Sequence, residues 1–364
     1  MNENQPPSNP SETGAPERTP AWELPAPPLE PRPRSTPWLL RLVLAMFVLL
    51  VGLLGYILYL FGPTGKSAQV RIPRGVGAAA VGEILERAGL IRSSGVFALY
   101  LRFSGRDKDL KPGFYRLEGR GLRAIALSLT DKSRPLSVSI TFPEGWRAVD
   151  MAERLSENNL DGPGFLELVQ NPPASLRPPE AKGPTLEGFL FPATYTFALD
   201  ARPEEIVQAM TRRMAQEFTP ERLEKLRALG LSVQDWVTLA SIVQAEAADA
   251  GERPIIAGIF LNRLDVGMPL QADPTVAYGL GKRLPELDRS AGDFAADTPY
   301  NTYARRGLPP TAIGNPGLDA LEAVLNPRRT DERGRKYLYF LHAQGRLFVN
   351  TTFEGHLRDT ARYR

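Results

Sequence analysis

The chain has 364 residues, 43% of them apolar, and a formal net charge of only +3, which is enough for two or three domains with buried cores. Its basic residues are dispersed, so the composition does not indicate a nucleic-acid partner. There is no cysteine and there are only two histidines, which excludes disulfides and thiolate metal sites and argues against a multi-histidine metal site or a serine–histidine triad. The chemistry left to the chain is that of carboxylates, and no metal or cofactor is expected.

The N-terminal region predicts a tail followed by a membrane anchor. Residues 1–37 hold eleven of the 34 prolines and are predicted to be a disordered cytoplasmic tail. Residues 38–62 are predicted to be a transmembrane helix, because the uncharged run at 42–61 spans roughly 30 Å as a helix. A cleaved signal peptide competes with this interpretation, but the run is long for one and no small-x-small cleavage site follows.

Basic residues flank the apolar run on both sides, so charge alone gives a weak orientation signal. The short tail and the large C-terminal part favour a cytoplasmic N-terminus and an extracytoplasmic body. We therefore expect a single-pass protein of the inner (plasma) membrane.

A short pattern of residues returns at an offset of seventy. Residues 72–76 (IPRGV) are echoed at 142–146 (FPEGW), and apolar positions behind them match as Val81 with Met151, Leu85 with Leu155, and Leu90 with Leu160. Each copy predicts a strand, a Pro-x-Gly turn and an amphipathic helix. Duplication and two similar corners without shared function both explain the pattern.

The remaining segments predict a mixed α+β fold. Proline-rich residues 162–186 are predicted to be loop, and residues 110–115 a turn leading into a strand. Periodicity predicts helices at 203–216, 220–229, 233–248, 252–265 and 319–325, with a Gly/Pro-rich region before residue 317. Residues 337–342 and 346–350 predict a hairpin that turns at Gln344 and Gly345.

Glu246 lies on the face of the predicted helix 233–248 where apolar residues should run. Ser232 and Asp235 form a capping box at its start, and the apolar positions Trp236, Leu239, Ile242 and Val243 recur at helical spacing toward Glu246. A carboxyl group pressed against hydrocarbon has a raised pKa, so it can act as a general acid near neutral pH. A purely structural role for Glu246, with Arg263 or Arg253 as its counterion, is an alternative explanation for a carboxylate at this position.

The segment after this helix concentrates amide, hydroxyl and aromatic side chains, at residues 262–264, 267–279, 300–303 and 308–317. Amides and hydroxyls recognise sugar hydroxyl and acetamido groups, and tyrosine rings cover the apolar face of a pyranose. Turn formation or core packing explains each element singly. Together they predict a polar cleft for a neutral glycan polymer.

In this order and spacing the motifs resemble those of the endolytic murein transglycosylase family (MltG, YceG-like). The matching motifs are 186–192 (LEGFLFP), 240–246 (ASIVQAE), 262–264 (NRL), 270–275 (LQADPT), 299–303 (PYNTY), 313–317 (IGNPG) and 337–340 (YLYF). The resemblance covers roughly residues 70–357 and the preceding anchor. The set is far more specific than any single motif.

The resemblance implies a LysM-like α/β glycan-binding subdomain at residues 68–137 and a YceG-like α+β catalytic domain at 138–358. It implies cleavage inside peptidoglycan strands between MurNAc and GlcNAc, which leaves 1,6-anhydro-MurNAc ends and terminates the elongation of nascent strands. Peptidoglycan synthases are the implied partners besides the glycan itself. The family's catalytic glutamate maps onto Glu246. Many relatives carry a second glutamate where this chain has Gln244, which leaves Glu246 as the candidate.

The implied reaction needs one carboxyl group that serves first as acid and then as base. Glu246 is the predicted catalytic residue, and the predicted substrate-binding residues are Glu187, Asn262, Arg263, Gln271, Asp273, Thr275, Tyr300, Asn301, Tyr303 and Asn315. Glu252 is explained by its place at a helix start, whereas Asp273 stays a modest rival carboxylate. A muramidase-type hydrolase and a non-catalytic wall-binding scaffold are the alternative functions.

Overall fold

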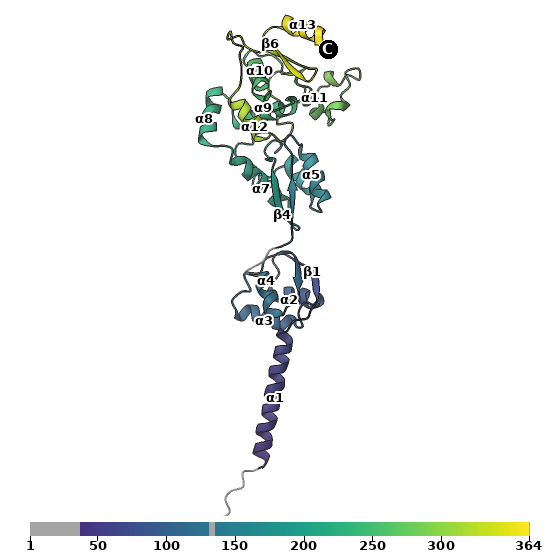
Figure 1. Ribbon diagram of the computed structural model, residues 1–364, viewed down its shortest axis with the longest axis vertical. Helices are drawn as coiled ribbons and strands as arrows, with labels where there is room; N and C mark the ends of the chain where they lie inside the picture. The colour runs from purple at the N-terminus through teal and green to yellow at the C-terminus, as the bar shows by residue number, and fades with distance from the viewer. Residues whose placement is uncertain (1–36, 131–134, 364) are drawn as a thin grey trace, which may run out of the picture. The chain divides into compact units, whose positions relative to one another are not determined.

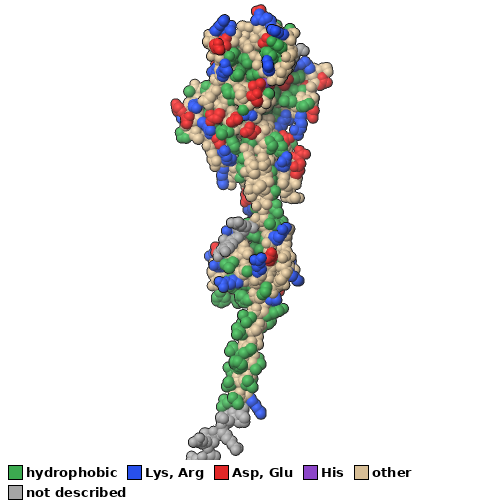
Figure 2. All heavy atoms as spheres, in the orientation of Figure 1, with side chains coloured by type: hydrophobic (Ala, Val, Ile, Leu, Met, Phe, Trp, Pro, Cys, Tyr) green, Lys and Arg blue, Asp and Glu red, His purple; other side chains and the backbone are tan. Residues whose placement is uncertain are grey.

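The computed structural model describes residues 37–130 and 135–363, and the chain divides into two units, Met1–Tyr59 and Leu60–Arg364 (Figure 1). The predicted disordered tail lies outside the described residues up to position 36. Helix α1 runs over Pro37–Phe61, and its residues Trp38–Phe61 are long and apolar enough to cross a membrane. Figure 2 shows hydrophobic side chains covering this helix, as the bilayer interior requires of a single span.

The second unit begins with a small module that has its own hydrophobic core. Its elements, in chain order, are β1 (Ser67–Ile72), α2 (Ala78–Arg87), α3 (Ser94–Phe103), β2 (Gly113–Glu118) and α4 (Leu122–Leu129). The two strands pair antiparallel, with Val70 opposite Tyr115, and both of these side chains are buried. We call residues 67–129 the first module.

The next segment repeats this order of elements. It comprises β3 (Ser137–Thr141), α5 (Ala148–Glu157), α6 (Gly162–Gln170), β4 (Thr194–Ala198) and α7 (Pro203–Ala215), with β3 and β4 antiparallel. We call residues 137–215 the second module. The prediction of loop at 162–186 was wrong for α6: Asp161 caps this helix by accepting from Gly164 N at 2.9 Å. Pro163 lies in the first turn, where its missing N–H leaves no hydrogen bond unmade.

The sequence echo at an offset of seventy corresponds to this structural repeat. The matched positions Val81 and Met151, Leu85 and Leu155, and Leu90 and Leu160 are all buried, each in the core of its own module. Gly75 and Gly145 occupy the same turn with φ of +75° and +79°, and Gly89 and Asn159 follow α2 and α5 with φ of +71° and +60°. The resemblance therefore extends from the corner to the whole strand–helix–helix–strand–helix unit.

The C-terminal part is mainly helical and follows the predicted order closely. Its elements are α8 (Pro220–Leu229), α9 (Val233–Glu246), α10 (Arg253–Asp265), α11 (Asp273–Gly279), η1 (Leu284–Glu286), η2 (Asp293–Ala295), α12 (Leu318–Leu325), β5 (Tyr339–Ala343), β6 (Arg346–Asn350) and α13 (Phe353–Tyr363). The predicted hairpin is confirmed, because β5 and β6 pair antiparallel around Gln344 and Gly345, whose φ angles of +51° and +69° fit a two-residue hairpin turn. Helix α11 lies in the region expected to be irregular.

Helix α9 is the centre of the larger core. Its predicted capping box is present, with Asp235 N donating to Ser232 Oγ at 3.1 Å and Ser232 N donating to Asp235 at 3.0 Å. Every residue from 236 to 243 is buried, so the helix is enclosed on all sides rather than along the single stripe that the periodicity predicted. It packs against α10, α11 and α12, and the core that it organises includes the second module (Figure 1).

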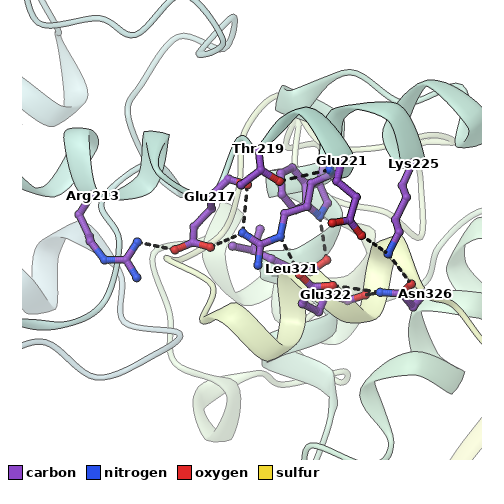
Figure 3. Close-up of polar contacts among 10 residues, drawn as sticks. Arg213, Glu217, Thr219, Glu221, Lys225, Leu321, Glu322 and Asn326 are labelled. Carbon is purple, nitrogen blue, oxygen red and sulfur yellow. Dashed lines mark hydrogen bonds and ion pairs between the residues drawn. The ribbon is translucent and has the colours of Figure 1, made fainter.

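A chain of ion pairs joins the helices that surround α9 (Figure 3). The buried carboxylate of Glu217 lies between Arg213 of α7 and Arg222 of α8 and pairs with both. Arg222 continues to Glu322 of α12, with Nε 2.6 Å from Oε1. Each charge is thus compensated, which matters because an unpaired buried charge destabilises a fold by about 3–5 kcal/mol.

Candidate functional site

A hollow of about 320 Å³ lies at the C-terminal end of α9, and we call it the Glu246 hollow. It is lined by Glu246, Arg263, Gln271, Asp273, Arg289, Tyr303, Phe340, Leu341, His342 and His356. Five of these were predicted as site residues from the sequence. They come from α9, α10, the start of α11 and the loop after η2, so only the fold brings them together.

The surroundings of Glu246 favour the protonated carboxyl group. Burial raises its pKa to about 8, helped by the nearby carboxylate of Asp273, while Arg263 and a hydrogen bond from the backbone N–H of Asp273 oppose the rise. Glu246 is also the last residue of α9, where the negative end of the helix dipole disfavours another negative charge. The predicted rise in pKa is therefore confirmed, and at neutral pH this group holds a proton that it can donate.

Asp273 faces the same hollow from the N-terminus of α11. The hydroxyl of Tyr303 donates a hydrogen bond to Asp273 Oδ1, and this bond together with burial raises the pKa of the tyrosine. The guanidinium group of Arg289 lies over two aromatic rings beside this pair. Its Cζ is 4.0 Å from the centre of the Phe294 ring and 6.0 Å from that of Tyr303. The carboxylate is thus held in one orientation beside Glu246.

Neither of the two predicted counterions forms an ion pair with Glu246 among the described residues. Arg263 donates from Nε to Leu338 O at 2.8 Å, so it fixes the chain that enters β5 and acts on Glu246 only through its charge. Arg253 lies instead 3.3 Å from Asp319 on α12. The glutamate therefore keeps its proton because no cation neutralises it directly.

Both histidines of the chain line the Glu246 hollow, a feature that the sequence analysis did not anticipate. His342 Nε2 lies 2.9 Å from Glu252 Oε2, and the same carboxylate accepts from Ala248 N at 2.9 Å. Glu252 was expected to favour the start of the next helix, and it does occupy the N-cap of α10, but its side chain makes no capping bond there. The contact joins β5 to the loop after α9, so no local pattern could reveal it.

Four predicted substrate-binding residues are wholly buried and bonded within the protein. Asn262, Thr275, Asn301 and Asn315 are each 0% exposed. Thr275 Oγ1 donates to Ala272 O at 2.6 Å, and Asn301 Nδ2 donates to Ala296 O at 2.8 Å. Asn262 Nδ2 donates to two backbone carbonyls in the segment that leads to β5, at 2.7 and 2.9 Å. These side chains fix the loops that carry the exposed residues.

Glu187 and Asn315 form a second buried network. Asn315 Nδ2 donates to Glu187 Oε1 at 2.8 Å, and the backbone N–H of Ala148, the first residue of α5, donates to the same carboxyl group at 3.0 Å. Tyr278 donates from 3.3 Å, and its ring centre lies 4.8 Å from that of Tyr300. Burial raises the pKa of Glu187 to about 7 despite these hydrogen bonds. The network anchors α5 beside α11.

The corner of the second module is clamped by the IGNPG motif. Gly145 N donates to Asn315 O at 2.7 Å, and Asn315 N donates to Trp146 O at 2.9 Å. Gln244 of α9 accepts from Gly317 N at 3.1 Å, which gives this side chain a structural role. A Cβ atom at Gly317 would lie 1.9 Å from the Glu144 carboxyl carbon, so a side chain there would require this half-exposed glutamate to move.

A second hollow, of about 550 Å³, is lined in part by α5, and we call it the α5 hollow. Ala245 and Pro274 line it, while their chain neighbours Glu246 and Asp273 line the Glu246 hollow. Its charged residues are Arg147, Asp150, Glu153, Arg154, Glu157 and Arg283. None of them was predicted as a site residue, since charges on an amphipathic helix ordinarily indicate a solvated face.

The part of the chain that the structure describes holds no cluster of three or more histidine, aspartate or glutamate side chains arranged for a metal ion. The residues that line the Glu246 hollow can carry out proton transfer by carboxyl groups, supported by tyrosine, amide and guanidinium groups.

Comparisons with known proteins agree with this geometry. The model of the YceG-like family matches residues 70–362. An endolytic murein transglycosylase of Bacillus subtilis is 32% identical over 315 residues, covering 82% of this chain and 85% of the relative. A Streptococcus pneumoniae protein of the same name is 30% identical over 330 residues, and there the match covers 82% of this chain but 58% of the relative.

A solved structure extends the likeness to the fold. The crystal structure of a YceG-like protein from Listeria monocytogenes aligns with a TM-score of 0.53 and 30% sequence identity, covering 81% of this chain and 99% of the other. By sequence and by structure, this chain belongs to the YceG-like family.

Proposed function

We propose that this protein is an endolytic murein transglycosylase, a lyase that cuts peptidoglycan strands internally, with Glu246 as its catalytic residue. One observation carries the proposal: a carboxyl group with a pKa of about 8 faces a hollow lined by polar and aromatic side chains. The names of the relatives supply the substrate class. The site supplies a carboxyl group that is still protonated at neutral pH and can therefore donate a proton.

In the proposed reaction, Glu246 transfers its proton to the glycosidic oxygen as the bond between this oxygen and C1 of MurNAc breaks. The resulting carboxylate then accepts the proton of the MurNAc 6-hydroxyl while O6 forms a bond to C1. The products are a 1,6-anhydro-MurNAc end and a GlcNAc end with a free 4-hydroxyl, and Glu246 is protonated again. Water is not consumed, in contrast to the two-carboxylate glycosidases.

Gln271 is the proposed partner of the substrate's acetamido group. It is exposed in the Glu246 hollow, and its φ of +50° places it in the left-handed region that residues other than glycine seldom occupy. Such strain is retained where the surrounding structure fixes it, here by the bond from Gln271 N to Thr302 O at 3.1 Å. The amide side chain therefore projects from a fixed backbone.

We further propose that the first module is a LysM-like glycan-binding subdomain and that α1 anchors the protein in the plasma membrane with the catalytic domain outside. The strand–helix–helix–strand order and the separate small core support the first statement. The apolar surface of α1 and its length support the second. Peptidoglycan synthases are proposed as partners on the family resemblance alone.

A muramidase-type hydrolase is the second candidate, and Asp273 is the observation that favours it. Its carboxylate lies in the same hollow as Glu246, so a second carboxyl group is available to activate water. Mass spectrometry of the products distinguishes the two reactions. An anhydro end identifies the lyase, whereas a reducing end that incorporates ¹⁸O from labelled water identifies the hydrolase.

Replacing the carboxyl group tests the catalytic assignment. Glu246→Gln keeps the size of the side chain and removes the transferable proton, so cleavage of purified glycan strands should fall by about 10³-fold or more. Glu224→Gln, which alters an exposed carboxyl group on α8 away from the Glu246 hollow, is the control and should retain most of the activity. Wild-type turnover by Glu246→Gln would exclude this residue as the acid. Undiminished binding to insoluble wall without any cleavage by the wild-type protein would favour a scaffold instead.

A further inference from the structure

We propose that the α5 hollow binds the peptide stem of the substrate, a short peptide that carries carboxylates and an ammonium group. The inference deepens the proposed function and rests on it. In peptidoglycan this stem is attached through a lactyl ether to C3 of the MurNAc ring, two ring bonds from the anomeric carbon at which cleavage occurs. A sugar placed for cleavage at Glu246 must therefore direct its stem into an adjoining space.

The position of the α5 hollow fits this requirement. Ala245 is exposed and lines the α5 hollow, whereas the following residue, Glu246, lines the Glu246 hollow. On the facing loop Pro274 and Asp273 divide between the two hollows in the same way. The two hollows share no lining residue, but consecutive residues line them at these two places, so a stem that leaves a ring bound at Glu246 has the α5 hollow on the other side of Ala245 and Pro274.

The charges of the α5 hollow fit a peptide better than a neutral glycan. Arg283 Nη2 lies 2.8 Å from Asp150 Oδ1, and Arg154 Nε lies 3.1 Å from Glu157 Oε2, so both signs alternate along the wall. Guanidinium groups bind carboxylates through two parallel hydrogen bonds, and carboxylates bind ammonium groups. Sugar hydroxyls need none of these charges.

Two arginines of the α5 hollow are held in place by aromatic rings. Arg154 Cζ lies 4.9 Å from the centre of the Trp146 ring, and Arg147 Cζ lies 5.3 Å from that of Tyr278. The guanidinium over Trp146 covers one face of the ring on which a sugar could otherwise stack. Side chains that are already ordered lose less entropy on binding, so these arginines are prepared for a charged ligand.

The first module shows that the fold does not need an aromatic or charged residue at four of these positions, although Glu153 and Glu157 correspond to the charged Glu83 and Arg87. At an offset of seventy, the positions of Trp146, Arg147, Asp150 and Arg154 are occupied in the first module by Val76, Gly77, Ala80 and Ile84. Both modules nevertheless form the same strand, turn and helix. The aromatic and charged set is therefore particular to the module that borders Glu246, as expected for residues that contact substrate.

The test compares two substrates and two matched double variants of the full-length protein in detergent. The substrates are uncross-linked glycan strands with intact stems and the same strands after an amidase has removed the stems. The test variant is Arg154→Gln with Arg283→Gln, whose side chains are 39% and 69% exposed. The control is Lys225→Gln with Arg227→Gln on α8, also 39% and 69% exposed and each paired with one carboxylate.

We expect the wild-type kcat/KM to be at least about tenfold higher for stem-bearing strands, since charge-assisted hydrogen bonds are lost with the stem. The test variant should lose about tenfold on stem-bearing strands and keep its rate on stripped strands, while the control keeps both. Equal wild-type rates on the two substrates would overturn the proposal. An equal loss on both substrates would overturn it as well and would indicate a structural role or glycan binding.

A binding measurement keeps the proposal testable if no strand is cleaved. Full-length Glu246→Gln is titrated by calorimetry with the MurNAc–GlcNAc disaccharide that bears a stem and with the same disaccharide without one. Tighter binding of the stem-bearing form by about tenfold, lost in the Arg154→Gln and Arg283→Gln background, supports the stem site even where the lyase assignment fails. Equal affinities contradict the stem site whatever the catalytic result.

Discussion

The two modules share an order of elements but differ in what their cores are joined to. The first module closes a hydrophobic core of its own, whereas the second shares its core with α9, α10 and α12. Its Pro-x-Gly corner is held by Asn315 and borders the α5 hollow. The same local architecture thus serves as a separate unit in one place and as part of the site wall in the other.

The pKa values of glutamates also shift in opposite directions in the first module and in the larger core. In the first module, hydrogen bonds from the hydroxyl and the backbone N–H of Ser94 lower the pKa of Glu86. In the larger core, burial raises the pKa of Glu187 to about 7 and that of Glu246 to about 8. Repeated architecture therefore says little about chemistry, which follows from what each copy is packed against.

Truncating the equivalent core leucines should give the largest difference in cleavage activity between a variant of the first module and a variant of the second. Leu85 and Leu155 are both 0% exposed, so replacing either by alanine should destabilise its own core by about 2–5 kcal/mol. Leu155→Ala should also slow cleavage of soluble glycan strands, because α5 carries the wall of the α5 hollow. Leu85→Ala should leave that rate unchanged. Thermal unfolding and initial cleavage rates measure the two effects, and an equal loss of activity in both variants would contradict the comparison.

The pH dependence of stability should also distinguish the regions. The folded protein retains the protons of Glu187 and Glu246, whereas the unfolded chain releases them above the ordinary glutamate pKa of 4.5. The free energy of unfolding of the larger core should therefore fall as pH rises from about 5 to about 8. Cleavage should decline above pH 8 as Glu246 loses its proton.

Glu246→Gln removes the contribution of one of these groups. At pH 8 the variant should be more stable than the wild type by about 1–2 kcal/mol, since a pKa unit corresponds to about 1.4 kcal/mol and the site is partly open to solvent. At pH 5 the two proteins should unfold at the same temperature. Calorimetric scans across this range measure the difference, and a stabilisation that does not vary with pH would show that charge is not its cause.

The smallest effect is expected at the glycines of the two corners. Gly75 and Gly145 have φ of +75° and +79°, so alanine at either position should cost about 1–2 kcal/mol. A Cβ atom at Gly75 would meet open space, whereas at Gly145 it would lie 3.3 Å from Gln244 Cγ. Gly145→Ala should therefore destabilise the protein slightly more than Gly75→Ala does. The same strain should also lower the rate of cleavage by about two- to threefold. Identical melting temperatures and activities for the two variants would remove the distinction.

Local patterns were sufficient to predict much of the fold. The capping box at Ser232, the hairpin at Gln344 and Gly345, and the helices on either side of Glu246 were confirmed because each depends on residues close in sequence. Helix α6 was missed because the many prolines of residues 162–186 were taken to indicate loop, although Pro163 lies in a first turn that tolerates proline and the others follow the helix. Helix α11 was missed because seven residues carry little periodicity.

In the candidate site, too, some features could be predicted from the sequence and others could not. Glu246 could be singled out from its position on an apolar helix, and its raised pKa follows from that position. The exposure of the other candidates could not be predicted, because residue type does not distinguish Gln271, which faces the hollow, from Asn301, which is buried and bonded to backbone. The same limit applied to His342, whose partner is ninety residues away.

The sequence by itself determined the apolar span, the two similar strand–turn–helix corners, the helices on either side of Glu246 and the expectation of a raised pKa for that glutamate, since these depend on composition, periodicity and local turn chemistry. The tertiary structure alone decided which polar residues line the Glu246 hollow and which only support it. It also placed the charged face of α5 beside Ala245. The physical reason is that exposure and charge pairing arise from contacts between segments far apart in the chain, which no local pattern records.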